Sequence, residues 1–213
     1  MNKRIIELIE RYPSVEPCLD SIIAAYEAIK ECFIRKSKLL LAGNGGSNSD
    51  CEHIVGELMK GFVKKRPMPD DIKKQLLCLD HERGELLSSS LQMGLPAINL
   101  SSHNSLNTAF INDVKNGGSL FFAQQVLGFG KEGDVLFLIS TSGNSENLIY
   151  ANMIAKIKHM KTIVLTGRDG GVLAKRGDIS IIVPEKETYK IQELHLPIYH
   201  TLCLLLEDNF FPV

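Results

Sequence analysis

The sequence predicts an α/β protein: a doubly wound, five-stranded parallel sheet flanked by helices, with extra helices at both ends of the chain. Five short β-type runs are continuously apolar rather than alternating, as expected of strands covered on both faces of a parallel sheet. Helical patterns separate these runs, and strands that alternate with helices are typical of a doubly wound layer rather than a sandwich. The runs are Lys38–Ala42, Ala97–Leu100, Val135–Ser140, Thr162–Thr166 and Ile179–Val183.

Three helical stretches exceed what a minimal sheet of this kind requires. Residues 15–36 carry apolar side chains near one face and complete a helical N-terminal region over residues 1–36. The final helix, over residues 188–208, is apolar on several sides, which predicts burial on more than one side and contacts between subunits. Prolines mark the ends of a helical insertion over residues 65–95, whose helical pattern covers Asp70–Met93.

Composition indicates one ordinary globular domain over residues 1–213, with 44% apolar and 23% charged residues and no repeat or linker. The net charge of -1, with lysine and arginine scattered, argues against nucleic-acid binding and against a polybasic membrane patch. No apolar run approaches the ~20 residues that span a bilayer, and the charged N-terminal stretch lacks a signal-peptide core. The five cysteines are odd in number and have no metal-like spacing, and apolar neighbours favour buried thiols at Cys18, Cys32 and Cys203. Reduced thiols in a cytoplasmic protein are therefore expected.

Two loops rich in glycine, serine and asparagine follow predicted strands at the carboxyl edge of the sheet, where open parallel sheets bind ligands. The first runs from Gly43 to Ser49 and the second from Ser140 to Ser145, and each leads into a helix. Glycines let backbone N–H groups turn toward an anion, and helix N-termini and hydroxyls add further donors. Two such loops on adjacent strands predict a cradle for a phosphate monoester. Either loop alone would fit turns and helix caps equally well.

A nucleotide cofactor is not expected. The chain has no GxxxxGK[ST] motif, so a P-loop is excluded. The first loop begins like GxGxxG, but Asn48 occupies the place of the third glycine. The second predicted strand ends at Leu100 and continues into Ser101 and Ser102, so the acidic residue that would bind a ribose is missing.

Candidate acid–base residues lie on two helices. His53 and Glu57 are four residues apart, so they project from one helical face within reach of a common ligand. On the last helix Gln192 and His200 are eight residues apart, about 80° around an ideal helix, and Pro197 lies between them. Taken singly, the His–Glu pair would more often be a surface ion pair, and His200 would more often be a core histidine.

Four motifs in order, AGNGGS…HxxxEL, ISTSGNS, LTGxDGG and IQExHxxxxH, resemble those of the sugar isomerase (SIS) domain family, and within it the phosphoheptose isomerases. The resemblance implies a SIS-type, flavodoxin-like sheet. It also implies an aldose–ketose isomerase that interconverts sedoheptulose 7-phosphate and D-glycero-D-manno-heptose 7-phosphate through an enediol. Members of this family are homotetramers with active sites between subunits.

The resemblance also implies the roles of individual residues. The family's proton-transferring glutamate and histidine match Glu57 and His200. Some members bind zinc, through residues that match His53, Glu57, Gln192 and His200. The family's phosphate and substrate contacts match Asn44, Gly45, Ser47, Asp113, Ser140, Thr141, Ser142, Ser145 and Gln192.

The chain departs from the family pattern near the sugar-binding end. Many members carry arginine four residues after the catalytic glutamate, where this chain has Gly61, and Tyr189 and Lys190 replace a frequent Asp-Arg pair. Together with the insertion over 65–95, these changes leave open an isomerase of another sugar phosphate. A non-catalytic SIS protein or a sugar-phosphate-sensing regulator is a further alternative, which the retention of Glu57 with His200 disfavours. No motif supports a role for His81, His103 or His159, which are expected to be structural or solvated.

Overall fold

The fold is a five-stranded, all-parallel sheet in the order β2-β1-β3-β4-β5, as a computed structural model of residues 2–212 shows. This order confirms the predicted doubly wound fold. The strands that follow β1 in the sequence lie on both sides of it, β2 on one side and β3 on the other. β1 and β3 pair from Leu39 with Val135 to Gly43 with Ile139. The loops that follow these two strands therefore lie side by side. The strands are β1 (Leu39–Gly43), β2 (Ala97–Asn99), β3 (Val135–Ser140), β4 (Lys161–Thr166) and β5 (Ile179–Ile182).

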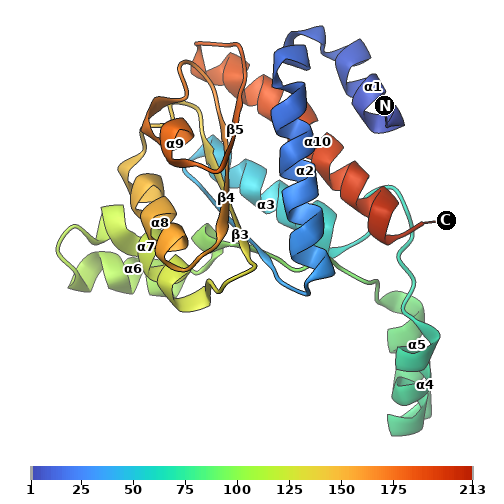
Figure 1. The fold of residues 1–213 in the computed structure, drawn as a ribbon. Coiled ribbons are helices and arrows are strands. Elements are labelled where there is room, and N and C mark those ends of the chain that lie inside the picture. Colours follow the sequence, from blue (N-terminus) through green and yellow to red (C-terminus); the bar gives the residue numbers. More distant parts are fainter. Residues whose placement is uncertain (1, 213) are drawn as a thin grey trace.

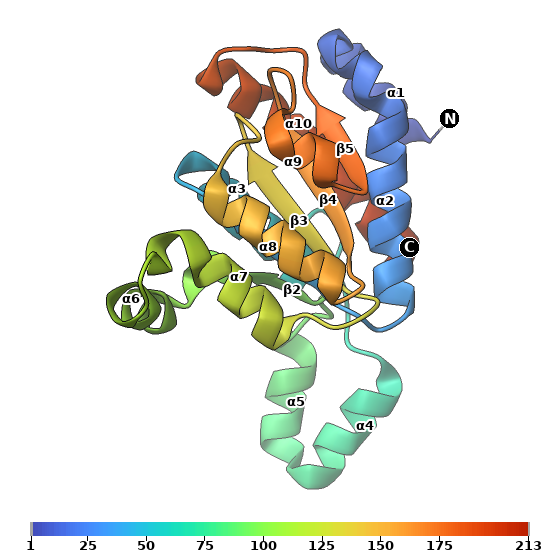
Figure 2. The same ribbon diagram turned by 60° about the vertical axis from the view of Figure 1, so that its left-hand side comes forward.

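Two separate hydrophobic cores explain why the strands are continuously apolar. Leu39 and Leu41 of β1 pack into one core, whereas Leu40 and Ala42 pack into the other, on the opposite face of the sheet. Figures 1 and 2 show the helices that cover the two faces. One face is covered by α2 (Leu19–Ile34), α3 (Gly46–Met59) and α10 (Thr188–Phe210); the other by α7 (Gly117–Phe129), α8 (Glu146–Ile157) and α9 (Gly171–Arg176).

The N-terminal region differs from the predicted helix over 15–36. Residues Pro13–Cys18 form a 3₁₀ helix (η1), and α2 begins only at Leu19. Pro17 lies inside η1 and cannot donate a backbone hydrogen bond, which accounts for the later start of α2. An additional helix, α1 (Lys3–Arg11), packs on α10 through buried Ile5 and Leu8.

The segment predicted as one helical stretch, Asp70–Met93, contains two helices, α4 (Asp70–Leu79) and α5 (His81–Ser90). The break is at Asp80, whose carboxylate caps α5 by accepting the N–H of Arg83 at 2.9 Å. Gly84 is the one buried residue of the two helices, because their backbones meet there. Figure 2 shows this hairpin projecting away from the sheet.

The final helix, α10, agrees with the predicted stretch 188–208 to within two residues. It contains Pro197, and its side chains are buried on several sides, as predicted. At the edge of the sheet that β2 forms, the chain continues into a short 3₁₀ helix, η2 (Leu100–Ser102), and then into α6 (Asn104–Asp113). Within residues 2–212, no helix is both long enough and apolar enough to cross a membrane.

Candidate active site

The loop after β1 turns sharply into α3. Gly45 precedes the helix with a positive φ of 56°, a conformation that glycine adopts without strain. At Gly46 a Cβ atom would clash with the side-chain amide of Gln192, so α10 lies directly against the first turn of α3. Ser47 is buried beneath the turn. The loop thus brings Gln192, from the far end of the sequence, to the N-terminus of α3.

The loop after β3 gathers hydroxyl groups at the N-terminus of α8. The hydroxyl oxygens of Ser140 and Ser145 are 3.2 Å apart, and the N–H of Gly143 donates to Ser140 Oγ at 3.2 Å. Ser142 Oγ accepts the N–H of Asn144, and Thr141 beside it is partly exposed. Ser145 precedes α8 without capping it through its side chain. Its hydroxyl and the free N–H groups of the helix are therefore available to an anion.

An amide pair joins the two loops. Asn44 and Asn147 each donate through Nδ2 to the Oδ1 of the other, at 3.0 and 2.9 Å. Because Asn44 belongs to the first loop and Asn147 to the first turn of α8, the pair fixes one helix N-terminus against the other. We call the two loops together the anion cradle: Gly43–Ser49 and Ser140–Ser145.

A second group of polar side chains lies farther along α3 and α10. His53 Nδ1 is 3.0 Å from Tyr199 Oη, and His53 Nε2 is 3.1 Å from Glu57 Oε1. Tyr199 Oη also donates to Asp50 Oδ1 at 3.2 Å. The His200 ring lies edge-on to His53, with the ring centroids 4.8 Å apart. These five residues, Asp50, His53, Glu57, Tyr199 and His200, form what we call the acid–base cluster.

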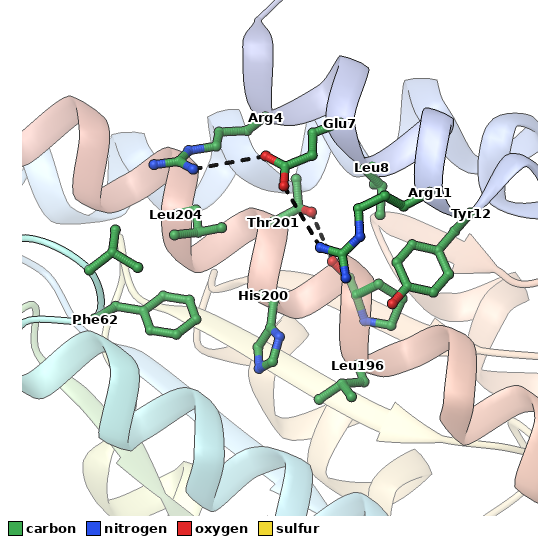
Figure 3. A pocket seen from close by; sticks show the side chains of 12 residues that line it. Arg4, Glu7, Leu8, Arg11, Tyr12, Phe62, Leu196, His200, Thr201 and Leu204 are labelled. Carbon is green, nitrogen blue, oxygen red and sulfur yellow. Dashed lines mark hydrogen bonds and ion pairs between the residues drawn. The ribbon is translucent and has the colours of Figure 1, made fainter.

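His200 is the member of this cluster that faces a cavity. The cavity has a volume of about 320 Å³ and lies between α1, α10 and the segment after α3, with Phe62 and Leu196 beside the imidazole (Figure 3). Burial, and then the nearby His53, lower the pKa of His200. Its Nε2 atom is buried and makes no hydrogen bond to any described residue. A neutral imidazole with an unused nitrogen can accept or deliver a proton near neutral pH.

A buried ion pair supports the end of α3 that carries Glu57. The Arg66 guanidinium donates to the carbonyls of Glu57 and Leu58 at 2.9 and 2.6 Å, and to Glu207 Oε1 at 2.9 Å. Glu207 also accepts the N–H groups of Phe62 and Val63. Burial alone would raise the pKa of Glu207, but these N–H donors and Arg66 outweigh it and hold the pKa below its ordinary value. The pair fixes the C-terminus of α3 against α10.

The predicted site residues therefore fall into two groups. Asn44, Gly45, Ser47, Gln192 and the serines after β3 lie at the N-terminal end of α3. The acid–base residues follow along the same helix, from Asp50 and His53 to Glu57, and the ten residues from Ser47 to Glu57 advance about 15 Å. Asp113 joins neither group: it is exposed, and among residues 2–212 its carboxylate is hydrogen-bonded to Asn112 alone.

Sequence reasoning missed Asp50, Tyr199, Asn147, Arg66 and Glu207. Asp50 stands at i, i+3 and i+7 with His53 and Glu57, a spacing that places all three on one helical face and could have identified it. The other residues carry no local pattern, because each acts through a partner 100 or more residues away, or through backbone carbonyls.

The zinc ligands predicted by resemblance are only partly gathered. His53, Glu57 and His200 lie together and offer the imidazole and carboxylate donors that zinc prefers. The unpartnered Nε2 of His200 fits such a role. Gln192 lies against Gly46 instead. Within the part of the chain that the structure describes, no three His, Cys, Asp or Glu residues are already arranged to hold a metal ion.

The parallel sheet, with its two glycine- and serine-rich loops, has the architecture of a class of proteins, those with a SIS domain. The SIS domain model matches residues 108–205. A phosphoheptose isomerase of a Nitratiruptor species is 40% identical over 188 residues, covering 88% of this chain and 83% of the relative. One of Coxiella burnetii is 34% identical over 202 residues, covering 93% of this chain and 87% of the relative.

Solved structures agree with these relatives. A phosphoheptose isomerase from Francisella tularensis superposes with a TM-score of 0.75 at 30% identity, covering 95% of this chain and 92% of its own. The enzyme from Neisseria gonorrhoeae gives 0.72 at 32% identity, covering 94% of each chain. This chain belongs to the phosphoheptose isomerase family.

Proposed function

We propose that the protein is an aldose–ketose isomerase that interconverts sedoheptulose 7-phosphate and D-glycero-D-manno-heptose 7-phosphate. The acid–base cluster carries the proposal. It places a partly buried carboxylate, Glu57, within 3.1 Å of one imidazole and near a second, His200, whose ring nitrogen is unused. Such a set of groups is what an enediol mechanism requires, and relatives with this name match most of the chain.

The phosphate of the substrate is held by the anion cradle. Ser140, Thr141, Ser142 and Ser145 offer hydroxyl groups beside the N-terminus of α8, and the loop of Asn44, Gly45 and Ser47 offers a second helix N-terminus. These donors carry no net charge, so binding relies on hydrogen bonds and on helix dipoles. Gln192 lies against the first turn of α3, beside the anion cradle, where it can contact the substrate.

Glu57 and His200 move the protons. Glu57 takes a proton from C1 of the ketose, which forms the enediol, and returns a proton to C2 to form the aldose. His200 passes a proton between the two substrate oxygens, because the O2 carbonyl gains a proton when the O1 hydroxyl loses one. The lowered pKa of His200 keeps it neutral, and therefore able to accept as well as donate, at neutral pH.

We propose zinc as a cofactor that His53, Glu57 and His200 would hold, with Gln192 as the fourth donor suggested by resemblance. When bound, zinc would polarise the substrate carbonyl as a Lewis acid. Glu57 can act as a base only while its carboxylate is free, so the role of Glu57 and the occupancy of the metal are linked.

A homotetramer in the cytoplasm, with active sites completed between subunits, is part of this proposal. The distance of about 15 Å along α3 between Ser47 of the cradle and Glu57 of the cluster is consistent with it, because a second copy could add side chains between them. Asp113, exposed and apart from both groups, fits a residue that completes a neighbour's site. Exposed apolar side chains such as Leu79, Leu86 and Ile157 are consistent with subunit contacts.

One observation favours a second candidate, isomerisation of a different sugar phosphate. At Gly61, where many relatives carry arginine, a Cβ atom would clash with the Lys64 carbonyl and lie 2.6 Å from Gln92 Oε1. Gln92 belongs to the segment after α5 and accepts the N–H of Gly61 at 3.2 Å. The backbone at Lys64 and the side chain of Gln92 therefore leave no room for a side chain at Gly61, which is consistent with a different sugar.

The test is to incubate the purified protein with sedoheptulose 7-phosphate, with and without zinc, and to detect an aldoheptose 7-phosphate. Parallel reactions with C5 and C6 ketose phosphates distinguish the two candidates. Product from the heptulose alone supports the first candidate, and a faster reaction of a shorter sugar supports the second. A folded protein that turns over none of these substrates would contradict both.

A further inference from the structure

Tyr199 connects two residues of α3 that are one turn apart. Its hydroxyl donates to Asp50 Oδ1 at 3.2 Å and lies 3.0 Å from His53 Nδ1. The Tyr199 side chain is only 2% exposed, and its ring packs edge-on against His53 with the centroids 5.6 Å apart. Asp50, Tyr199 and His53 thus form a chain of hydrogen-bonding groups, and the far nitrogen of His53 lies 3.1 Å from the proposed catalytic base, Glu57.

The chemistry of this chain fixes the direction of its protons. A tyrosine hydroxyl has one proton, and an ionised carboxylate can only accept. With Asp50 ionised, the Tyr199 hydroxyl donates its proton to Asp50, the tyrosine oxygen accepts from His53, and Nδ1 carries the proton. In the neutral imidazole Nε2 then holds a lone pair, which faces Glu57 Oε1 at 3.1 Å.

Packing alone does not explain the hydrogen bonding of the two carboxylate oxygens of Asp50. Its Oδ1 accepts from Tyr199, whereas its Oδ2 is buried and makes no hydrogen bond to any residue between 2 and 212. A buried, half-satisfied carboxylate costs free energy, so its presence requires a compensating role. Holding the tyrosine hydroxyl in one orientation is such a role.

We propose that Tyr199 and Asp50 are positioning residues, which hold the His53 imidazole with Nδ1 protonated and present the Nε2 lone pair to the place that Glu57 faces. This inference rests on the proposed function, because it assigns His53 its orientation in the isomerase site. A lone pair and a carboxylate oxygen that face each other leave a place for a cation, either a proton or the proposed zinc. Groups behind a ligating histidine commonly tune metal affinity in this way.

The test compares Tyr199→Phe with wild-type protein. Tyr199→Phe removes only the hydroxyl group, and the matched control is Tyr26→Phe, whose ring is partly buried on α2, away from the cluster. Full-length proteins labelled with ¹⁵N-histidine are examined by NMR about two pH units above the ordinary histidine pKa of about 6.5, with His53→Gln used to assign the signals. We expect Nδ1–H in the wild type and in Tyr26→Phe, and a shift toward Nε2–H in Tyr199→Phe.

Two further measurements distinguish positioning from a structural role. Zinc affinity, measured by chelator competition, should be about 10–100-fold weaker in Tyr199→Phe and unchanged in Tyr26→Phe. With sedoheptulose 7-phosphate, kcat should fall while KM stays, because the anion cradle is untouched. If Tyr199→Phe does not fold, Asp50→Asn tests the same chain of hydrogen bonds from its other end.

The inference is overturned if His53 has the same tautomer in wild type and in a folded Tyr199→Phe, even when zinc affinity falls. It is also overturned if the wild type already carries its proton on Nε2. The NMR and zinc measurements need no turnover. A wild-type protein that shows the expected tautomer but no isomerase activity would therefore contradict the proposed function and leave this inference standing.

Discussion

The anion cradle and the acid–base cluster follow one another along α3 and are built in different ways. The cradle consists of backbone N–H groups and uncharged hydroxyls from two contiguous loops that one amide pair holds together. The cluster consists of side chains from two helices, whose contacting residues are more than 130 positions apart in the sequence, with a buried ion pair behind them. We therefore expect phosphate binding to be distributed over many small contributions and proton transfer to depend on a few groups.

The largest expected effect lies in the cluster. Glu57→Gln keeps the size of the side chain but removes the base, so kcat should fall about 10²–10⁴-fold while KM changes little. Steady-state kinetics with the heptulose phosphate measures both. Glu52→Gln, an exposed residue on the same helix, is the matched control. A parallel rise in KM in Glu57→Gln would show that the carboxylate also binds the substrate, and would weaken the division between the two regions.

The next effect concerns the support behind the cluster. Arg66→Met leaves Glu207 buried without its cation, which should cost about 3–5 kcal/mol of stability in denaturant unfolding. The last turn of α3 loses two carbonyl contacts, so kcat should also fall. Adding Glu207→Leu should restore part of the stability, since the unpaired charge is removed. Exposed Lys65→Met is the control, and a loss of equal size there would contradict a specific role of the buried pair.

His195 lies on α10 between the two regions and makes stability depend on pH. Burial lowers the pKa of His195 to about 4, from an ordinary value of 6.5. The unfolded chain therefore binds the proton more readily, and stability rises with pH across this window. Titration of His195 does not reduce the free energy of unfolding above about pH 6.5. As the pH falls to about 4, it lowers the free energy of unfolding by about 3 kcal/mol in total.

His195→Met tests this dependence directly. Neither ring nitrogen of His195 is within ordinary hydrogen-bond geometry of any described residue, so methionine should be tolerated at neutral pH. In denaturant unfolding, the free energy of unfolding of the variant should fall less between pH 6.5 and 4 than that of the wild type. Replacement of an exposed histidine, His81→Asn, should leave the pH profile unchanged. An unaltered profile in His195→Met would show that other groups cause the pH dependence.

The smallest effect is expected in the cradle. Ser145→Ala removes one hydroxyl that faces Ser140, and a hydrogen bond to a charged ligand is worth about 1.5–3 kcal/mol. The remaining donors compensate in part, so KM should rise about 10-fold while kcat changes little. Ser90→Ala, at the exposed end of α5, is the control. A fall in kcat with an unchanged KM would mean that the cradle and the cluster do not divide the work as proposed.

Local sequence patterns predict the fold, because the apolar runs of the strands and the periodicity of the helices depend only on residues close together in the sequence. All five strands were predicted, and the ends of β3 were predicted to the residue. The errors in the helix boundaries were caused by single residues rather than by the hydrophobic pattern. Pro17 delayed the start of α2, and Asp80 supplied a cap that divided one predicted helix into α4 and α5. The spacing of apolar residues predicts neither effect, since both arise from hydrogen bonds of single residues.

The sequence by itself determined the anion cradle, because its glycines, serines and helix starts are contiguous and their chemistry follows from residue type and order. Only the tertiary structure decided which side chains meet the proposed catalytic base. Tyr199 reaches Asp50 and His53, and Arg66 reaches Glu207, because α3 and α10 pack side by side on one face of the sheet. The physical reason is that these contacts join segments more than 130 residues apart, where no local periodicity specifies a partner.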